Sequence, residues 1–269
     1  MTGGEGDGAL LELRGISKQF GAVQALTDVD FSVRRGEVVA LVGDNGAGKS
    51  TLVKVIEGVG PANAGEIRFA GRLARIADPH DATALGIATV YQDLALCDNL
   101  DVAGNLFLGR EERRRGLAGA VGWLHEVGME RRATDLLWTL SVRLPSVRTP
   151  VASLSGGQRQ SVAIARSLIG EPRVVLLDEP TAALGVAQTA QVLDLIRRLR
   201  DRGLGVVVIS HNLADVFAVA DRIVVLRLGR NAGEFDVAGT TREQVVAAIT
   251  GAADADAAAT DVGPAGVGS

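Results

Sequence analysis

The stretch Gly43-Asp44-Asn45-Gly46-Ala47-Gly48-Lys49-Ser50-Thr51 decides the fold of this chain. An apolar run at 38–42 precedes it and predicts a buried strand, and residues 52–56 after it predict a helix. Strand, glycine-rich turn, Lys-Ser and helix form the context of a phosphate-binding loop. Small residues let successive backbone N–H groups surround phosphate oxygens, and the helix N-terminus directs its positive end at the same anion. The stretch therefore predicts a nucleoside triphosphate site.

The side chains of this loop suit a triphosphate bound with a metal ion. Lys49 can reach the β- and γ-phosphates, and the Ser50 hydroxyl can bind Mg²⁺. The residues that we expect to contact the nucleotide are Gly43, Asn45, Gly46, Ala47, Gly48, Lys49, Ser50 and Thr51.

Composition excludes several classes of protein. The chain has 269 residues, of which 47% are apolar and 3% aromatic, so we expect an aliphatic core. The net charge of -4 argues against broad, nonspecific binding of nucleic acid. A single cysteine excludes an internal disulfide and a cysteine-based zinc cluster. Because no apolar run has the length of a membrane span and the N-terminus lacks the pattern of a secretion signal, we expect a cytoplasmic protein.

The order of the predicted elements indicates an α/β fold with a helical insertion. The first strand is predicted to start at 9–13 and a short strand lies at 31–33, and the apolar run at 205–209 is typical of a strand inside a parallel sheet. Between about residues 93 and 153 helical patterns replace the strands, with helical spacing over 121–140. The sequence therefore predicts an inserted helical subdomain.

These boundaries define one domain with two flanking segments. We expect a domain over 9–250, whose α/β core comprises 9–92 and 154–250. The ends at 1–8 and 251–269 have little to bury, and we expect them to be disordered.

Two carboxylates follow a second apolar strand, predicted at 173–177. In a parallel sheet the carboxyl ends of the strands open onto the ligand crevice, so Asp178 is expected beside the phosphate loop, where it can hold Mg²⁺. Glu179 would project past the metal and orient or deprotonate an attacking water. The alternative is an acidic turn that closes a core strand.

A second anion site is predicted at Ser155-Gly156-Gly157-Gln158, where Ser155 can cap a helix and two glycines leave backbone N–H groups open. A helical insertion separates this site from the phosphate loop, so one monomer cannot easily place both on one γ-phosphate. We therefore expect a head-to-tail dimer with two-fold symmetry, in which each Ser155 helix closes over the partner's nucleotide.

The phosphate loop, the run Leu154–Gln158 and the run Leu176-Leu177-Asp178-Glu179-Pro180, in this order and spacing, resemble the ATP-binding subunit of ABC transporters. The resemblance covers about residues 9–250. It implies a P-loop NTPase (RecA-like) core with an antiparallel β edge and an inserted α-helical subdomain. It also implies ATP hydrolysis, with ATP and Mg²⁺ bound.

The resemblance implies further site residues. Gln92 matches the glutamine that contacts Mg²⁺ and the attacking water, and His211 matches the histidine that contacts the γ-phosphate. Phe20 falls where the family places an aromatic ring on adenine, with Val23 beside it. The alternatives are that His211 caps the following helix and that Phe20 packs in the core.

The segments 90–100 and 179–186 are more similar to the ATPases of bacterial sugar importers of the ribose, xylose and fructose type. Many members of that group fuse two ATPase halves, whereas this chain has one, so we expect a homodimer or pairing with a separate ATPase. Gly185 stands where ABC proteins often have aspartate, but glycine is common in this group. Phe20 replaces the commoner tyrosine and keeps its stacking face.

The leading hypothesis is therefore an ATPase that drives import of a monosaccharide through separate transmembrane permease subunits. A periplasmic or extracellular sugar-binding protein is implied indirectly, and the chain would lie on the inner face of the cell membrane. Alternatives are a soluble ABC ATPase that acts on nucleic acid or ribosomes, an importer ATPase for another solute, and a regulatory module without turnover. Long coiled coils or a second ATPase domain would favour the first alternative, and the chain has neither.

Overall fold

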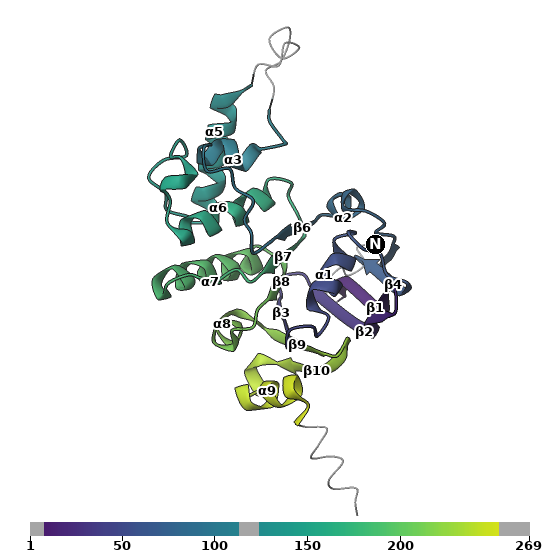
Figure 1. The fold of residues 1–269 in the computed structure, drawn as a ribbon. Helices are drawn as coiled ribbons and strands as arrows, with labels where there is room; N and C mark the ends of the chain where they lie inside the picture. Colours follow the sequence, from purple (N-terminus) through teal and green to yellow (C-terminus); the bar gives the residue numbers. More distant parts are fainter. Residues whose placement is uncertain (1–7, 113–123, 253–269) are drawn as a thin grey trace, which may run out of the picture.

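The computed structural model describes residues 8–112 and 124–252, and two sheets organise it (Figure 1). The strands are β1 Ala9–Phe20, β2 Val23–Arg34, β3 Val38–Val42, β4 Ala64–Phe69, β5 Arg72–Ala74, β6 Ile87–Val90, β7 Val174–Asp178, β8 Gly205–Ile209, β9 Arg222–Arg227 and β10 Arg230–Asp236. The helices are α1 Lys49–Ile56, α2 Pro79–Leu85, α3 Val102–Phe107, α5 Glu126–Thr139, α6 Gly156–Leu168, α7 Val186–Asp201, α8 Leu213–Val219 and α9 Arg242–Thr250, with 3₁₀ turns at Val151–Ser153 and Val237–Gly239.

The larger sheet has the strand order β10-β9-β3-β8-β7-β6, and all neighbours except β10 and β9 run parallel. Every residue of β3 and β8 is buried, because helices or the second sheet cover both faces. Leu41 pairs with Ile209, and Ile209 pairs with Asp178. The carboxyl ends of β3, β8 and β7 therefore meet at one edge, directly before the phosphate loop and the two carboxylates.

The smaller sheet is antiparallel, in the order β2-β1-β4-β5. Helix α1 contributes Leu52, Val55 and Ile56 to the core cluster that the two sheets share. The second core cluster lies on the other face of the larger sheet and includes residues of α3, α5, α6, α7, α8 and α9. The predicted α/β fold with an antiparallel edge and a helical insertion is confirmed.

Strand lengths at the antiparallel edge differ from the prediction. β1 and β2 each span twelve residues, whereas the sequence pattern predicts that the first strand starts at 9–13 and that a short strand lies at 31–33. Both strands have irregular register, and the halves next to their connecting turn, 15–20 and 23–28, each contain one buried residue among exposed and half-buried ones. Because buried and exposed positions do not alternate regularly there, a period-two pattern cannot reveal these halves. β5 and β10 also lie where the sequence pattern predicts no strand.

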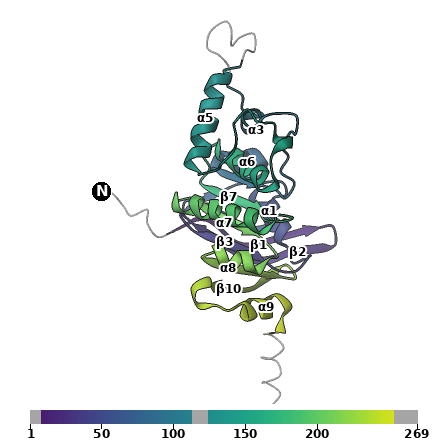
Figure 2. The ribbon, with the colours of Figure 1, turned by 90° about the vertical axis from the view of Figure 1, so that its left-hand side faces the viewer.

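Between β6 and α6 the chain forms α3, α5 and a 3₁₀ turn, which lie at the opposite end of the molecule from α9 in both ribbon views (Figure 2). The predicted helix over 121–140 begins too early, because α5 starts at Glu126, after the non-helical Leu124. Val121 lies outside the described residues. Leu124 precedes the helix and Val127 is exposed, whereas the buried face carries Met129, Ala133 and Leu137. The apolar spacing was therefore wrong at Leu124 and Val127, but it was right at Leu136, Leu137 and Leu140, which lie in the core or pack against it.

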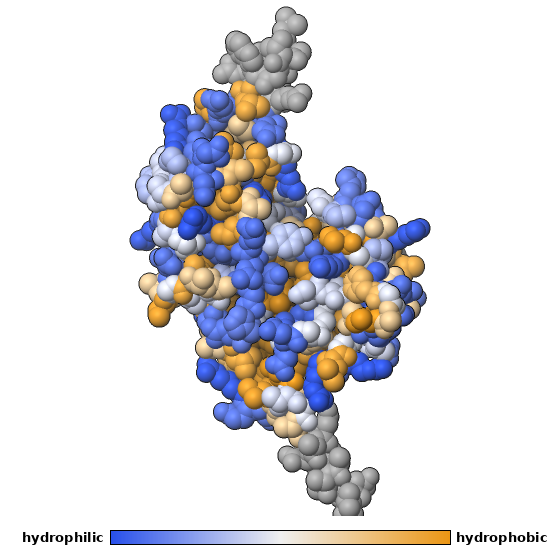
Figure 3. Space-filling model, in the orientation of Figure 1, coloured by the Kyte–Doolittle hydropathy of each residue, from blue (hydrophilic) through white to orange (hydrophobic). Residues whose placement is uncertain are grey.

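The face seen in Figure 3 carries polar and apolar side chains interspersed. Within the described ranges, each helix is too short or too polar to cross a lipid bilayer. The predicted disordered ends lie outside the described residues at 1–7 and 253–269, and Gly251 ends α9 in the left-handed conformation.

Candidate functional site

A cavity of about 530 Å³ opens where β3, β7 and β8 end. The predicted site residues that line it are Val23, Asn45, Gly46, Ala47, Gly48, Lys49, Ser50, Thr51, Gln92, Asp178, Glu179 and His211. The topology explains this convergence, because parallel strands present their carboxyl ends at one edge. Residues separated by more than 180 positions along the chain thus face one space.

The loop between β3 and α1 keeps its shape because glycines occupy backbone conformations that other residues avoid. Gly43 has φ 147°, and a Cβ atom there would lie 2.2 Å from the carbonyl oxygen of Leu226. Gly48 has φ 105°, and its Cβ would lie 2.7 Å from Leu26 Cδ2. Both positions therefore require glycine. α1 begins at Lys49, so its N-terminal N–H groups face the cavity, as anion binding requires.

The Lys49 side chain folds back over the loop. Its Nζ donates hydrogen bonds to the carbonyl oxygens of Gly43, at 2.6 Å, and Asp44, at 2.9 Å. Burial lowers the pKa of the Lys49 ammonium, while the charges of Glu179, Asp44 and Asp178 oppose this shift. Gly43 does not line the cavity, and its role here is to hold Lys49 through its carbonyl.

Asp178 ends β7, and burial followed by the charge of Glu179 raises the pKa of its carboxyl, whereas Lys49 lowers it. A divalent cation beside the carboxylate would stabilise its charged form. Ser50 and Gln92 line the same cavity and supply further oxygen atoms, which are the ligands that Mg²⁺ prefers. These residues therefore fit a magnesium site.

Glu179 is held at the end of β7 by its backbone. Its N–H donates to the carbonyl oxygen of Ile209 at 2.9 Å, and its φ of 48° is left-handed. Such strain in a non-glycine residue is typical of functional positions. The carboxylate Oε1 lies 2.7 Å from Nδ1 of His211. The Glu179 side chain therefore faces the cavity and contacts His211. Its backbone also lies in the turn that follows β7.

His211 follows β8, and its side chain is 76% exposed at the cavity. The alternative role as a helix cap is excluded, because the Asn212 side chain caps α8 by accepting a hydrogen bond from the Ala214 N–H. Phe20 is 51% exposed at the end of β1, so its alternative role in the core is also excluded. Lys18 Nζ lies 5.1 Å from the Phe20 ring, a cation–π contact.

The residues Ser155, Gly156, Gly157 and Gln158 are not brought to this cavity within one chain. They begin α6 with the predicted cap. The Ser155 hydroxyl accepts from the Gln158 N–H at 3.3 Å, and Gln158 Oε1 accepts from the Ser155 N–H at 3.0 Å. This capping box fixes the start of α6 at Ser155.

Leu228 lines the cavity and Arg166 lies outside it, and neither was predicted from the sequence; Gln24, Ala25, Ile209 and Gly229 line the cavity without having been predicted as well. Leu228 lies in the turn between β9 and β10, outside every predicted motif. Arg166 of α6 donates to the carbonyl oxygens of Ala95, at 2.7 Å, and Leu94, at 3.4 Å, and so ties the segment after Gln92 to α6. An exposed leucine directly before a turn glycine was the available signal for the first. Nothing local marks the second.

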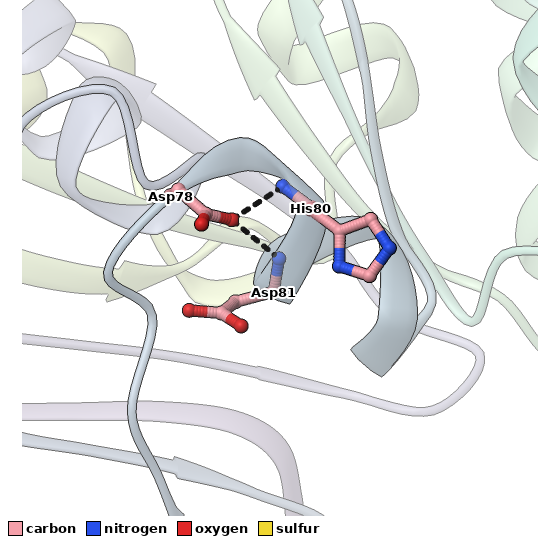
Figure 4. A group of neighbouring side chains, drawn as sticks. All are labelled: Asp78, His80 and Asp81. Atoms are coloured by element: carbon pink, nitrogen blue, oxygen red, sulfur yellow. Dashed lines mark hydrogen bonds between the residues drawn. The ribbon is translucent and has the colours of Figure 1, made fainter.

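Asp78, His80 and Asp81 lie together at the start of α2 (Figure 4). The Asp78 carboxylate accepts hydrogen bonds from the backbone N–H groups of His80, at 2.8 Å, and Asp81, at 3.0 Å. Asp81 accepts one from the Ala77 N–H at 2.9 Å. Helix capping accounts for both carboxylates, and we assign no metal to this cluster.

Comparison with known proteins identifies the relatives of this chain. The family model described as ABC transporter matches residues 26–182. A xylose/arabinose import ATP-binding protein of Sulfolobus acidocaldarius is 46% identical, over 82% of this chain and 86% of the relative. A fructose import ATP-binding protein of Rhizobium meliloti is 45% identical, over 90% of this chain and 94% of the relative.

Other relatives are longer, and solved structures share the fold. A putative ribose/galactose/methyl galactoside import ATP-binding protein of Burkholderia cenocepacia is 43% identical over 90% of this chain, which spans 46% of that relative. A solved ATP-binding cassette of an ABC transporter superposes with a TM-score of 0.78 at 27% identity, over 90% of this chain and 99% of the other. A dimeric ATP-binding cassette bound to ADP and Pi superposes with a TM-score of 0.69 at 26% identity, over 86% and 100%.

Proposed function

The chain belongs to the ABC transporter family of ATP-binding proteins, which hydrolyse ATP, and on this premise we propose that it energises import of a monosaccharide. The observation that carries the proposal is the shared cavity of Lys49, Asp178, Glu179 and His211, in a chain 43–46% identical to sugar import ATP-binding proteins. In the proposal residues 9–250 are the ATPase domain, with a helical subdomain at about 93–153.

In the proposed mechanism the phosphates of ATP bind the N-terminus of α1 and the loop before it. Lys49 leaves its carbonyl partners and moves to the β- and γ-phosphate oxygens, where its charge stabilises the transition state. Ser50, Gln92 and Asp178 would hold Mg²⁺, which would neutralise charge at the phosphates. These residues position the reacting groups and add little covalent chemistry.

Glu179 acts on the attacking water in this proposal. Its carboxylate orients the water and accepts its proton, while the contact with His211 keeps the carboxylate facing the cavity. His211 also contacts the γ-phosphate. Phe20 stacks on adenine with Val23 beside it, and both side chains are exposed and ready for such a contact.

The proposed active unit is a dimer of this chain, or of this chain with a separate ATPase subunit. Ser155, Gly156, Gly157 and Gln158 of one chain close over the nucleotide of the other. The position of these residues outside their own cavity supports this arrangement, as does the dimeric relative. The dimer would bind transmembrane permease subunits at the inner face of the cell membrane, and a sugar-binding protein would deliver the solute.

Two measurements test the proposal in sequence. Purified chain should release phosphate from Mg·ATP, and the Lys49→Ala variant should not. The chain reconstituted with its permease and sugar-binding protein should then take up a monosaccharide only when ATP is enclosed. Phosphate release that does not depend on Lys49 would contradict the ATPase mechanism, and uptake of a different solute would contradict the sugar assignment.

A further inference from the structure

Leu228 is an unusual residue for its position, because the two-residue turn between β9 and β10 requires a left-handed backbone that suits asparagine, aspartate or glycine. It lies in the turn between β9 and β10 with φ 48°, a left-handed conformation that disfavours leucine. Its side chain is 79% exposed. An exposed leucine gains little from burial in the folded chain, and the backbone conformation costs stability. A ligand that covers the side chain would account for its presence.

The turn that carries Leu228 is fixed relative to the phosphate loop and to β2. The Gly229 N–H donates to the carbonyl oxygen of Ala47 at 3.0 Å, and its carbonyl accepts from the Thr27 N–H at 2.8 Å. A Cβ atom at Gly229 would lie 2.6 Å from the carbonyl oxygen of Ala25, so only glycine permits this approach. Leu228 is therefore held at a defined place beside the loop.

Leu228 lines the same cavity as Val23, although 205 positions separate them along the chain. Val23 is 66% exposed and pairs with Phe20 across the hairpin of β1 and β2. The mouth of the cavity thus presents apolar side chains from two separate elements. Triphosphate oxygens gain nothing from such side chains, whereas the faces of a purine base do.

We propose that Leu228 binds the base of the nucleotide and forms, with Phe20 and Val23, an apolar wall that sets the affinity for nucleosides over bare phosphate chains. This inference rests on the proposed nucleotide site and adds a binding residue to it. Because the contact is apolar, it favours purine bases as a class and does not distinguish adenine from guanine by hydrogen bonds.

The experiment distinguishes binding of the base from binding of the phosphates. Calorimetry measures the Kd of wild type and of Leu228→Asn for Mg·ATP, Mg·GTP and magnesium tripolyphosphate. Asparagine tolerates the left-handed conformation, so the variant keeps the turn while losing the apolar surface. Removal of some 40 Å² of apolar contact corresponds to a rise in Kd of about five-fold for both nucleotides. The Kd for tripolyphosphate should not change.

Two further variants sharpen the result. Leu228→Met keeps an apolar side chain and should bind ATP as wild type does. Leu73→Asn removes a leucine that is 70% exposed on β5, away from the cavity, and should leave all three Kd values unchanged. An unchanged Kd for ATP in Leu228→Asn, or an equal loss for ATP and tripolyphosphate, would overturn the role of Leu228. If wild type binds neither ligand, the nucleotide site itself is wrong and this inference falls with it.

Discussion

Nδ1 of His211 lies 2.7 Å from Oε1 of Glu179, and this contact joins the ends of two neighbouring parallel strands. The Glu179 side chain is 17% exposed, and its backbone N–H is bound to Ile209 at the end of β8. The carboxylate is therefore held from both its backbone and its side chain. A carboxylate that is held in this way would need little reorganisation to act as the proposed base.

Replacement of Glu179 by glutamine should abolish turnover and preserve binding. The amide keeps the shape of the side chain but cannot accept a proton, so the rate of phosphate release should fall by about 100-fold or more. Mg·ATP should still bind, and the variant should accumulate as a nucleotide-bound dimer in light scattering. Glu171→Gln, at an exposed turn after α6, is the control. Undiminished turnover would remove Glu179 from the role of base.

Replacement of His211 by alanine should lower kcat by about 10-fold to 1,000-fold and change KM little, because the residue acts on a group that reacts. The neighbouring Asn212→Ala variant is a matched control. It removes the cap of α8, so its unfolding free energy should fall by about 1 kcal/mol while its kcat stays near that of wild type. Equal kcat values for the two variants would contradict a role for His211 in hydrolysis.

Glu57 should make stability depend on pH. Burial raises the pKa of its carboxyl above the usual 4.5, while hydrogen bonds from Thr89 and Tyr91 limit the shift. Between 4.5 and the raised value the folded state binds more protons than the unfolded state, so the unfolding free energy falls as pH rises. Glutamine cannot titrate and can still accept the Tyr91 hydrogen bond.

Urea unfolding of wild type and Glu57→Gln across the acid range to neutral pH measures this effect. The stability of the variant relative to wild type should increase as pH rises through that window and then stay constant. A difference that is independent of pH, or one that changes in the opposite direction, would show that the carboxyl titrates normally in the folded chain.

Loss of Arg222 should destabilise the fold more than loss of a surface arginine. Its buried guanidinium binds the Glu37 carboxylate, with Nε at 2.8 Å from Oε1, and also contacts Glu234 and the carbonyl oxygen of Ser32. Arg222→Ala leaves the Glu37 charge buried without this partner, which costs about 3–5 kcal/mol. Arg198→Ala breaks an exposed pair with Asp194 and should cost about 1 kcal/mol or less. Similar losses in urea unfolding would contradict this difference.

Local patterns were sufficient to predict the parts of the site that lie at strand ends. The loop before α1 and the pair Asp178 and Glu179 each carry their signal within ten residues, because a parallel sheet fixes where strand ends lie. Leu228 stands directly before a turn glycine, which indicates a turn but no contact with a nucleotide. Its relation to Val23 arises only when the β9–β10 turn packs on the phosphate loop, a contact between distant segments.

Contacts between distant segments also explain the errors in the predicted fold. The start of α5 was misplaced because Leu124 and Val127 fit a helical spacing although both are exposed. The halves of β1 and β2 next to their connecting turn were missed because they are stabilised by pairing across a hairpin with irregular register. Such pairing depends on the partner strand and not on the local pattern.

The central claim is that each ATP site combines the phosphate loop of one chain with Ser155 of another. Phosphate release by a mixture of two inactive variants, Lys49→Ala and Ser155→Arg, tests it most directly. A mixed dimer contains one site with both parts intact and one site with both parts altered. Because half of the dimers are mixed and each has one active site of two, the mixture should recover about a quarter of the wild-type rate. A mixture as inactive as its separate components, with mixed dimers shown to form, would contradict the shared site.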